Sequence, residues 1–286
     1  MFSNMVTDCG FLGSSKNYEE SKILIIGVPM DYTVSFRPGT RFAYKRIKDV
    51  FNLLEDYSPF LNRSLNDKKY YDVGELDLPY GNIYKSFEKI RECTKTVLQD
   101  GKKPIFIGGE HLISAPIIRE FYEFYRDELV VLHFDAHADL REEYMGENYS
   151  HASVMRRVLD FMKPENLYQF GIRSGTKEEF EWAQRNTNFY PFEVVYPLCS
   201  IIDDIRNRPI YITLDIDVVD PSCAPGTGTP EFGGISSKEI LETIYILKDL
   251  NVVGMDIVEV SPPYDLSDMT SILAAKIIRE SILSFL

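Results

Sequence analysis

Short apolar runs alternate with longer amphipathic stretches along this chain, and that alternation limits the folds open to it. Eight runs rich in Ile, Val, Tyr and Phe are bounded by Gly, Pro, Asn or Asp, which is typical of strands. They occupy residues 22–29, 68–73, 103–109, 128–135, 166–173, 193–197, 209–217 and 251–260. Several are apolar on both alternating positions, as strands buried on both faces of a sheet are. The pattern predicts one α/β domain over residues 1–286, with a mainly parallel sheet covered by helices on both faces.

Three of the intervening stretches carry helical signals. In residues 83–99, apolar side chains recur every three to four residues and so share one stripe of a helix, which Gly101 ends. Residues 236–249 begin with Ser236 and have Glu239 nearby, a pattern that predicts a capped helix start. Residues 267–286 are predicted to form a terminal helix.

Charge and targeting signals exclude some partners. The chain has 31 Lys and Arg against 44 Asp and Glu, a net charge of −13, which argues against binding a nucleic-acid backbone. It is compatible with a small cationic substrate. The N-terminus lacks a signal-peptide pattern, and the apolar run 23–30 is too short to cross a bilayer. We therefore expect a cytoplasmic protein with no membrane partner. Its cysteines show no CxxC pairing and are expected to be reduced thiols: Cys9, Cys93, Cys199 and Cys223.

Histidines and aspartates gather behind three of the predicted strands. Asp135-Ala-His137-Ala-Asp139 follows VVLHF, and residues two apart in an extended backbone point to the same side. Asp215-Ile-Asp217 follows IYITL, and His111 ends the tetrapeptide GGEH after KPIFI. Parallel sheets bind ligands at the carboxyl ends of their strands, so we expect these side chains to converge.

The composition of this set indicates metal chemistry. Two imidazoles and four carboxylates exceed what one ion with open positions needs, and they suit two ions that share bridging carboxylates. Oxygen-rich ligands favour a cation such as Mn²⁺ over a thiolate-type zinc site. Helix or turn capping by the aspartates and a structural role for His111 are the alternatives. Cys223 is interpreted as a small buried hydrophobe.

Three motifs in this order resemble the metal-binding signatures of the ureohydrolase family, which contains arginases and agmatinases. They are GGEH (108–111), FDAHAD (134–139) and LDIDVVDPSCAPGTGTPE (214–231). The likeness extends over nearly the whole chain, through RPGTRFA (37–43), GELDLP (74–79), FGIRSGT (170–176) and DIVEVSPPYD (256–265). It implies a single three-layer α/β/α domain and assembly into a homo-oligomer, a trimer or a hexamer.

The resemblance also implies a role for each site residue. It places one Mn²⁺ on His111, Asp135, Asp139 and Asp215, and the second on Asp135, His137, Asp215 and Asp217, with Asp135 and Asp215 bridging. His151 matches a family histidine that assists proton transfer. Glu259 matches a glutamate that pairs with the substrate guanidinium. Asp139 is expected to hold a proton and pass it to the leaving amine.

The implied reaction is hydrolysis of agmatine to putrescine and urea, by attack of a hydroxide that bridges the two ions on the guanidinium carbon. The loop after residue 139 departs from the arginase pattern, since LREE and ENYSH stand where arginases carry an Asn and a Ser-Gly-Asn. Other substrates stay open: guanidinobutyrate, arginine, guanidine and formiminoglutamate. A non-catalytic metal-binding homologue is disfavoured, because such a protein would have lost metal ligands that this chain keeps. A di-metal phosphoesterase is also disfavoured, because it would need phosphate-binding basic residues, which are scarce near the motifs.

Residues beside the motifs receive more modest interpretations. His133 is interpreted as a core histidine with one hydrogen bond, although it could instead support Asp135. Glu110 is interpreted as a structural or capping residue. Thr227 and Thr229 either donate to a ligand or sit in a turn. We interpret three glutamates of the following loop as solvated charges that are also compatible with a cationic substrate tail: Glu142, Glu143 and Glu147.

Overall fold

A computed structural model describes residues 10–285, so the predictions for Cys9 and for the last residue of the terminal helix lie outside the described residues. Eight strands form one sheet, and every neighbouring pair is parallel. In spatial order the strands are β4 (Tyr70–Glu75), β1 (Ile23–Val28), β5 (Lys103–Gly108), β10 (Val252–Val258), β9 (Ile210–Asp215), β6 (Val130–Phe134), β7 (Leu167–Phe170) and β8 (Asn188–Tyr190). A short antiparallel hairpin, β2 (Tyr57–Ser58) and β3 (Arg63–Ser64), stands apart from the sheet.

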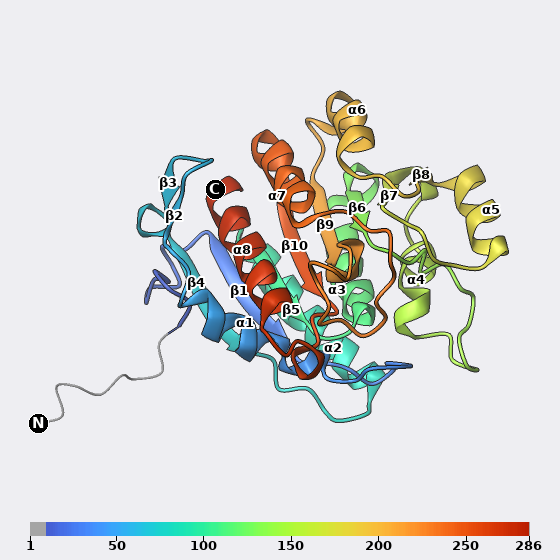
Figure 1. The fold of residues 1–286 in the computed structure, drawn as a ribbon, viewed down its shortest axis with the longest axis horizontal. Coiled ribbons are helices and arrows are strands. Elements are labelled where there is room, and N and C mark those ends of the chain that lie inside the picture. Colours follow the sequence, from blue (N-terminus) through green and yellow to red (C-terminus); the bar gives the residue numbers. More distant parts are fainter. Residues whose placement is uncertain (1–9, 286) are drawn as a thin grey trace, which may run out of the picture.

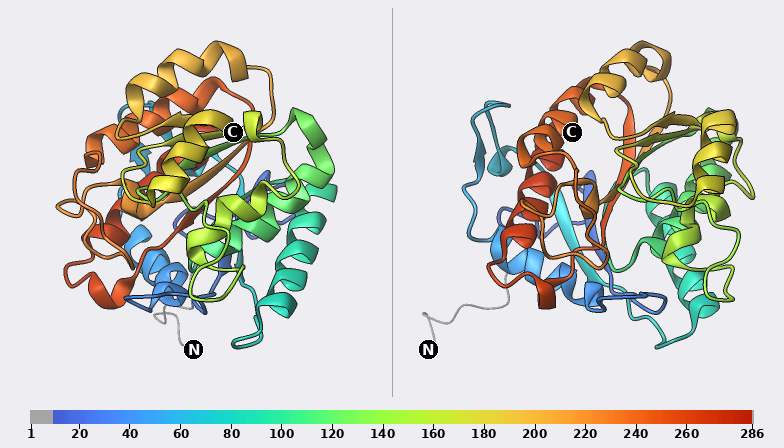
Figure 2. Two further views of the ribbon diagram at one scale, coloured as in Figure 1. Left: turned by 90° about the vertical axis from the view of Figure 1, so that its right-hand side faces the viewer. Right: turned by 45° about the vertical axis from the view of Figure 1, so that its right-hand side comes forward.

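Helices cover both faces of the sheet, as Figures 1 and 2 show. One layer contains α1 (Ala43–Phe51), α6 (Val195–Ile205), α7 (Ser237–Ile246) and α8 (Met269–Ser284). The opposite layer contains α2 (Ile83–Gln99), α3 (Ser114–Tyr125), α4 (Val154–Val158) and α5 (Lys177–Asn186). The predicted α/β fold with a three-layer α/β/α arrangement is therefore confirmed.

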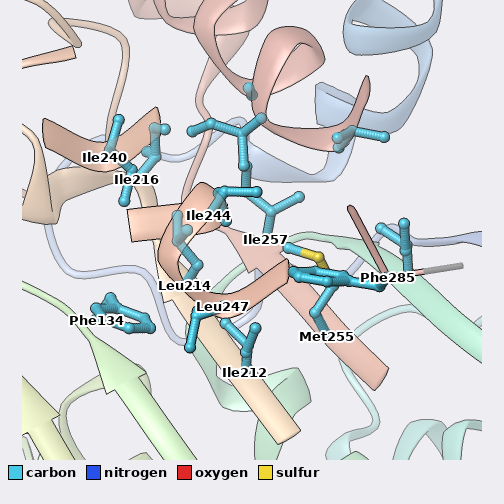
Figure 3. Packing of buried hydrophobic residues seen from close by; sticks show 14 of the residues in the cluster. Phe134, Ile212, Leu214, Ile216, Ile240, Ile244, Leu247, Met255, Ile257 and Phe285 are labelled. Atoms are coloured by element: carbon cyan, nitrogen blue, oxygen red, sulfur yellow. The ribbon is translucent and has the colours of Figure 1, made fainter. Parts of the chain in front are cut away.

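Strand alternation divides the core into two clusters, one on each face. In β1, Ile23 and Ile25 pack with the α8 layer, whereas Leu24 and Ile26 pack with the α2 layer. Figure 3 shows part of the first cluster, in which α7 lies over β9 and β10. The contacts come from Ile240 and Ile244 of α7 and from Leu247 directly after it, spaced four and three residues apart. Each such buried side chain contributes about 2 kcal/mol through loss of apolar surface from water.

The strongest helix predictions agree with the structure. Helix α2 covers residues 83–99, and the side chain of Asn82 accepts a hydrogen bond from the Lys85 N–H at its start. Helix α7 begins with a capping box, because Ser236 Oγ accepts from the Glu239 N–H while Glu239 accepts from the Ser236 N–H.

The strand predicted at 193–197 is wrong. The strand in this region is β8, and helix α6 begins at Val195. Pro197 falls in the first turn of α6, where its missing N–H costs no helical hydrogen bond. A short apolar run beside a proline is therefore equally consistent with a helix start.

The four central strands set up the functional region. They follow one another in the sheet as β5, β10, β9 and β6, and the segments after their carboxyl ends meet at one edge. Chain order is interrupted there, since β5 leads through α3 to β6 on the far side of β9 and β10. Such a switch point leaves a crevice at the strand ends. Within the described residues, the structure contains no helix with the length and apolarity that crossing a membrane requires.

Candidate metal centre and substrate cavity

The predicted site residues converge at the carboxyl ends of these four strands. His111 opens a short helical turn after β5, Asp135 directly follows β6, and Asp215 is the last residue of β9. Glu259 directly follows β10. All the predicted metal ligands except His137 are buried, and His137 is about one-quarter exposed. Each strand thus delivers at least one polar side chain to a buried site.

A first group surrounds Nδ1 of His111. This atom lies 2.9 Å from Asp135 Oδ2, 3.1 Å from Asp139 Oδ2 and 3.5 Å from Asp215 Oδ2. One imidazole nitrogen therefore faces three carboxylates from two strands. These are the four residues that the resemblance assigns to one ion.

A second group forms around His137. Its Nδ1 lies 2.9 Å from Asp217 Oδ2 and 3.5 Å from Asp135 Oδ1. Asp135 therefore reaches both groups, one oxygen to each, which is the geometry that a bridging carboxylate requires. Asp215 contacts the first group, and its Oδ1 accepts from the Asp217 N–H at 2.8 Å. The structure thus places Asp135 between the groups more directly than Asp215.

The buried carboxylates of the cluster lie close together, and this arrangement favours the binding of a cation. Burial raises the pKa of Asp215 well above its ordinary value, and the charges of Asp217 and Asp135 add to the rise. Burial and the charge of Asp135 raise the pKa of Asp139 as well. Burial opposes protonation of His111 and His137, yet the surrounding carboxylates hold the pKa of both imidazoles well above the usual value. The site therefore attracts cations.

Two atoms support a metal more specifically. His111 Nδ1 and Asp217 Oδ2 are buried and make no hydrogen bond, although both lie within ion-pair distance of neighbours. A buried polar atom without a partner is costly, and a divalent cation between an imidazole nitrogen and carboxylate oxygens removes that cost. Two groups of these residues place one ligand atom each within 4.8 Å of one another: His111, His133, Asp135 and Asp139, and Asp135, His137 and Asp217. The residues therefore fit a pair of metal ions.

Asp139 reaches the cluster through an unusual backbone. The segment after β6 leaves the sheet, so strand alternation does not explain the convergence predicted for residues 135, 137 and 139. Asp139 instead has φ of 53°, in the left-handed region, which turns its carboxylate back toward His111. Asp is among the few non-glycine residues that adopt this conformation readily.

A cavity of about 190 Å³ opens above the cluster. Six of the predicted site residues line it: His111, His137, Asp139, His151, Asp215 and Glu259. Polar residues of four loops and of α5 complete the lining, among them Ser35, Arg141, Tyr144, Ser174, Glu179 and Thr229. Asp135 and Asp217 do not line it and so lie deeper. The cavity is therefore polar, and Arg141 is its one lining Lys or Arg.

Glu259 is held rigidly at the wall of this cavity. Its Oε1 accepts from the His111 N–H at 2.7 Å, and its own N–H donates to Gly109 O at 3.0 Å. Burial, with the charge of Glu110, raises the pKa of Glu259 to about 8. A Cβ at Gly228 would lie 3.1 Å from Glu259 Oε2, so the glycine leaves space beside the carboxylate. That space is suited to a cationic group.

His151 lies on the other side of the cavity. Its N–H donates to Thr33 Oγ1 at 3.0 Å, its Nε2 lies 3.3 Å from Ser35 Oγ, and its Nδ1 is buried without a hydrogen bond. Burial lowers the pKa of His151 to about 4, so the ring is neutral at pH 7.

Glu110 is structural, as interpreted. It is fully buried and accepts hydrogen bonds from the backbone N–H groups of Tyr32 and Thr33 and from the Thr33 hydroxyl. These bonds fix the loop that carries Thr33 and Ser35 beside His151. Glu110 thereby holds one wall of the cavity in place.

A buried network orients His111. Thr213 Oγ1 donates to Asp256 Oδ1 at 2.8 Å, and the hydroxyl therefore accepts from His111 Nε2, 2.9 Å away. Tyr211 also donates to Asp256, at 2.7 Å. The proton of a neutral His111 is fixed on Nε2, and Nδ1 is left free to face the three carboxylates. Sequence reasoning missed Thr213 and Asp256, although Thr213 lies two residues before Asp215 on β9 and Asp256 lies three residues before Glu259.

A second network orients Asp135. Gln169 Nε2 donates to Ala138 O at 2.9 Å and to His133 Nδ1 at 3.1 Å, so the other ring nitrogen of His133 donates to Asp135 Oδ2, 2.9 Å away. Thr187 donates to Gln169 Oε1. His133 therefore makes two hydrogen bonds rather than the one expected of a core histidine, and it supports Asp135.

The threonines, loop glutamates and cysteines near the motifs differ in whether they contact the cavity. Thr227 is buried and its hydroxyl has no partner, whereas Thr229 lines the cavity. Glu142 is exposed and pairs with Arg156, and Glu143 is exposed too, as solvated charges are. The three cysteines that the structure describes are unpaired, and Cys223 packs partly buried against the core.

Comparison with known proteins agrees with this geometry. The family model described as "Arginase family" matches residues 21–284. The chain is 50% identical to an agmatinase of Bacillus anthracis and 48% identical to an agmatinase of Bacillus subtilis, in each case over 96% of both chains. The crystal structure of an agmatine ureohydrolase of Thermoplasma volcanium superposes with a TM-score of 0.88 at 33% identity, over 96% of this chain and 94% of that one.

The fold and the buried His/Asp cluster are those of a ureohydrolase, and the chain belongs to the arginase family. It is accordingly an enzyme that cleaves carbon–nitrogen bonds of guanidino or amidino groups.

Proposed function

We propose that this enzyme is an agmatinase, which hydrolyses agmatine to putrescine and urea. The observation that carries the proposal is the buried carboxylate of Glu259 on the same cavity as the His/Asp cluster. A guanidinium that pairs with this carboxylate would have its central carbon above the metal ligands. The agmatinases of the two Bacillus species, 48–50% identical over most of the chain, support the choice of substrate.

We propose two Mn²⁺ ions in the cluster. His111, Asp135, Asp139 and Asp215 would hold one, and Asp135, His137, Asp215 and Asp217 the other. The oxygen-rich ligand set favours a hard or borderline cation. When bound, such a metal pair supplies a water molecule acidic enough to act as a nucleophile near neutral pH.

Glu259 would bind and orient the substrate. Its carboxylate forms a charge-assisted contact with the guanidinium, and the His111 N–H fixes the orientation of that carboxylate. The absence of a side chain at Gly228 avoids a close contact with the second carboxylate oxygen, because a Cβ there would lie 3.1 Å from Oε2. Holding the guanidinium at a fixed distance from the nucleophile lowers the entropic part of the barrier.

Asp139 and His151 would move protons. Burial raises the pKa of Asp139, so its carboxylate can take a proton at Oδ1, the oxygen that is not the one paired with His111, and pass it to the leaving amine. His151 is neutral and borders the same cavity, and its ring can carry a proton between that cavity and solvent.

Arg141 bears on the choice between agmatine and guanidinobutyrate, whose tails have opposite charge. An uncompensated guanidinium on the cavity wall would favour a carboxylate tail. Arg141 Nε, however, lies 3.5 Å from Glu179 Oε2, and its guanidinium stacks on the Tyr144 ring. Its charge is thus partly neutralised, which removes the main obstacle to a cationic tail.

Urea release from agmatine, arginine, guanidinobutyrate and guanidine, each with Mn²⁺ present, tests the assignment. We expect agmatine to show by far the highest kcat/KM. Dominant turnover of another compound would keep the enzyme class and overturn the substrate. Silence on all four with metal bound would point to a formimino substrate such as formiminoglutamate.

We further propose a cytoplasmic homo-oligomer, a trimer or a hexamer, that acts in polyamine synthesis. The relation to bacterial agmatinases supports this placement. Mass photometry of the purified metal-loaded protein measures the oligomer directly.

A further inference from the structure

A second cavity, of about 550 Å³, adjoins the catalytic one. Tyr144 lines both, and Thr33 and Ser150 of the second cavity are bonded to or neighbour His151 of the first. The loops that form it follow β1, β4 and β6 and lie along one edge of the molecule, low in Figure 1. The two cavities therefore meet at Tyr144.

The turn at residues 144–147 places a carboxylate at this boundary. Tyr144 and Glu147 exchange two backbone hydrogen bonds, of 2.9 and 3.0 Å, and pair as an antiparallel bridge. Met145 and Gly146 between them have φ of 53° and 86°, as the central residues of a tight hairpin turn do. Residues that pair directly across an antiparallel bridge project to the same side, so Glu147 stands beside the Tyr144 ring.

The lining of the second cavity is chemically suited to a cation. It contains three tyrosines, Tyr32, Tyr84 and Tyr144, and one carboxylate, Glu147, and it contains no Lys or Arg. The Tyr32 hydroxyl is fixed by donation to Pro79 O at 2.8 Å. Aromatic faces attract ammonium groups, and a single carboxylate among them adds charge complementarity. Tyr144 already accepts the Arg141 guanidinium on one face.

We infer that this aromatic cavity binds the primary ammonium at the far end of the substrate, with Glu147 and Tyr84 as specificity-determining residues. The inference rests on the proposed function and names the site that distinguishes a cationic tail from an anionic one. It gives Glu147 a role that its exposure alone does not suggest. The neighbouring Glu143, which lines neither cavity, has no such role.

Steady-state kinetics with two substrates test this site. Glu147→Gln should raise KM for agmatine roughly fivefold, as expected for a partly exposed ion pair, with a smaller change in kcat. KM for guanidinobutyrate should stay the same or fall. The matched control Glu143→Gln should leave both KM values at wild type. An unchanged KM for agmatine in Glu147→Gln, or an equal rise for both substrates, would overturn the inference.

Tyr84→Leu tests the aromatic part separately. It should raise KM for agmatine about threefold through loss of a cation–π contact, while Tyr80→Leu, an exposed tyrosine outside both cavities, should not. Equal effects of the two changes would argue against an aromatic site.

Calorimetric titration of the metal-loaded enzyme with 1,4-diaminobutane separates this inference from the proposed function. If agmatine is not a substrate but diamine binding is weakened by Glu147→Gln, the cavity stands and the assigned reaction falls. If agmatine is hydrolysed but Glu147→Gln changes neither diamine binding nor the KM for agmatine, the assigned reaction stands and the cavity assignment is refuted.

Discussion

Nδ1 of His111 lies 2.9 Å from Oδ2 of Asp135, and the other oxygen of the same carboxylate lies 3.5 Å from Nδ1 of His137. Among the described residues, Asp135 is therefore the one aspartate with one oxygen toward each of these two imidazoles. Asp135→Ala should cost metal at both positions, and activity with it. Metal content per chain, measured by mass spectrometry after gel filtration, checks this, with the exposed Asp203→Ala as control. Two tightly bound ions in the Asp135→Ala protein would remove its bridging role.

Thr213 is expected to act on the metal through His111. Thr213→Val removes the hydroxyl that accepts from Nε2 and relays to Asp256, so the imidazole loses its fixed orientation. We expect Mn²⁺ affinity to fall about 10- to 100-fold. Thr213→Ser keeps the hydroxyl and should restore most of the affinity. Fluorescence or calorimetric titration of the metal-free protein gives the Mn²⁺ affinities of both variants. Wild-type affinity in Thr213→Val would show that the hydrogen bonds from Asp256 through Thr213 to His111 do not affect metal binding.

Gln169 should affect stability as well as metal binding. Gln169→Leu leaves Ala138 O and His133 Nδ1 without donors inside the core, and each buried unsatisfied group is costly. The free energy of unfolding should fall by about 2–3 kcal/mol, and Mn²⁺ affinity should fall with it. Denaturant unfolding checks the first, with Gln184→Leu on the exposed face of α5 as control. Equal stability of the two variants would contradict the network.

Glu259→Gln should separate substrate binding from metal binding. The amide keeps the size of the side chain but loses the charge that pairs with a guanidinium. The transition state should therefore lose about 2–4 kcal/mol of stabilisation, which is measured as a lower kcat/KM. Metal content should remain that of the wild type, because Glu259 is not a proposed ligand. The exposed Glu242→Gln provides the matched control. Near-normal kinetics would remove Glu259 from the site.

Metal uptake should depend on pH in a defined direction. Surrounding carboxylates raise the pKa of His111 and His137 in the metal-free protein, and a bound ion must displace the protons they carry. Apparent Mn²⁺ affinity should therefore keep rising as the pH increases above the ordinary imidazole pKa of about 6.5, with proton release on binding. Calorimetry in two buffers of different ionisation enthalpy counts the protons. An affinity that is flat over this range would contradict the assigned charge states.

The sequence predicted the parts of this structure that depend on local pattern. The helix at residues 83–99 and the capped start at Ser236 follow from periodicity and capping, and both are confirmed. Convergence of the histidines and aspartates followed from their positions behind parallel strands. The error at 193–197 arose because a short apolar run has no period that separates a strand from a helix start.

Features that depend on tertiary contacts could not be predicted from the sequence. Gln169 supports Asp135 only because β7 pairs with β6, and Thr213 meets His111 only because β9 and β5 lie on either side of β10. The left-handed backbone of Asp139 likewise leaves no signal in the composition of its segment. These residues are ordinary in sequence and acquire their roles from strand order.

The spatial order β5, β10, β9, β6 carries a consequence for biosynthesis. Of these four strands, β5 and β6 are synthesised first, and one edge of each stays unpaired until a strand encoded at least 75 residues later has been made. The catalytic centre cannot exist on a nascent chain until β9 and β10 have inserted between them. A metal ion that needs residues of all these strands could therefore bind only late in synthesis, and until β9 and β10 are in place β5 and β6 each keep an unpaired edge.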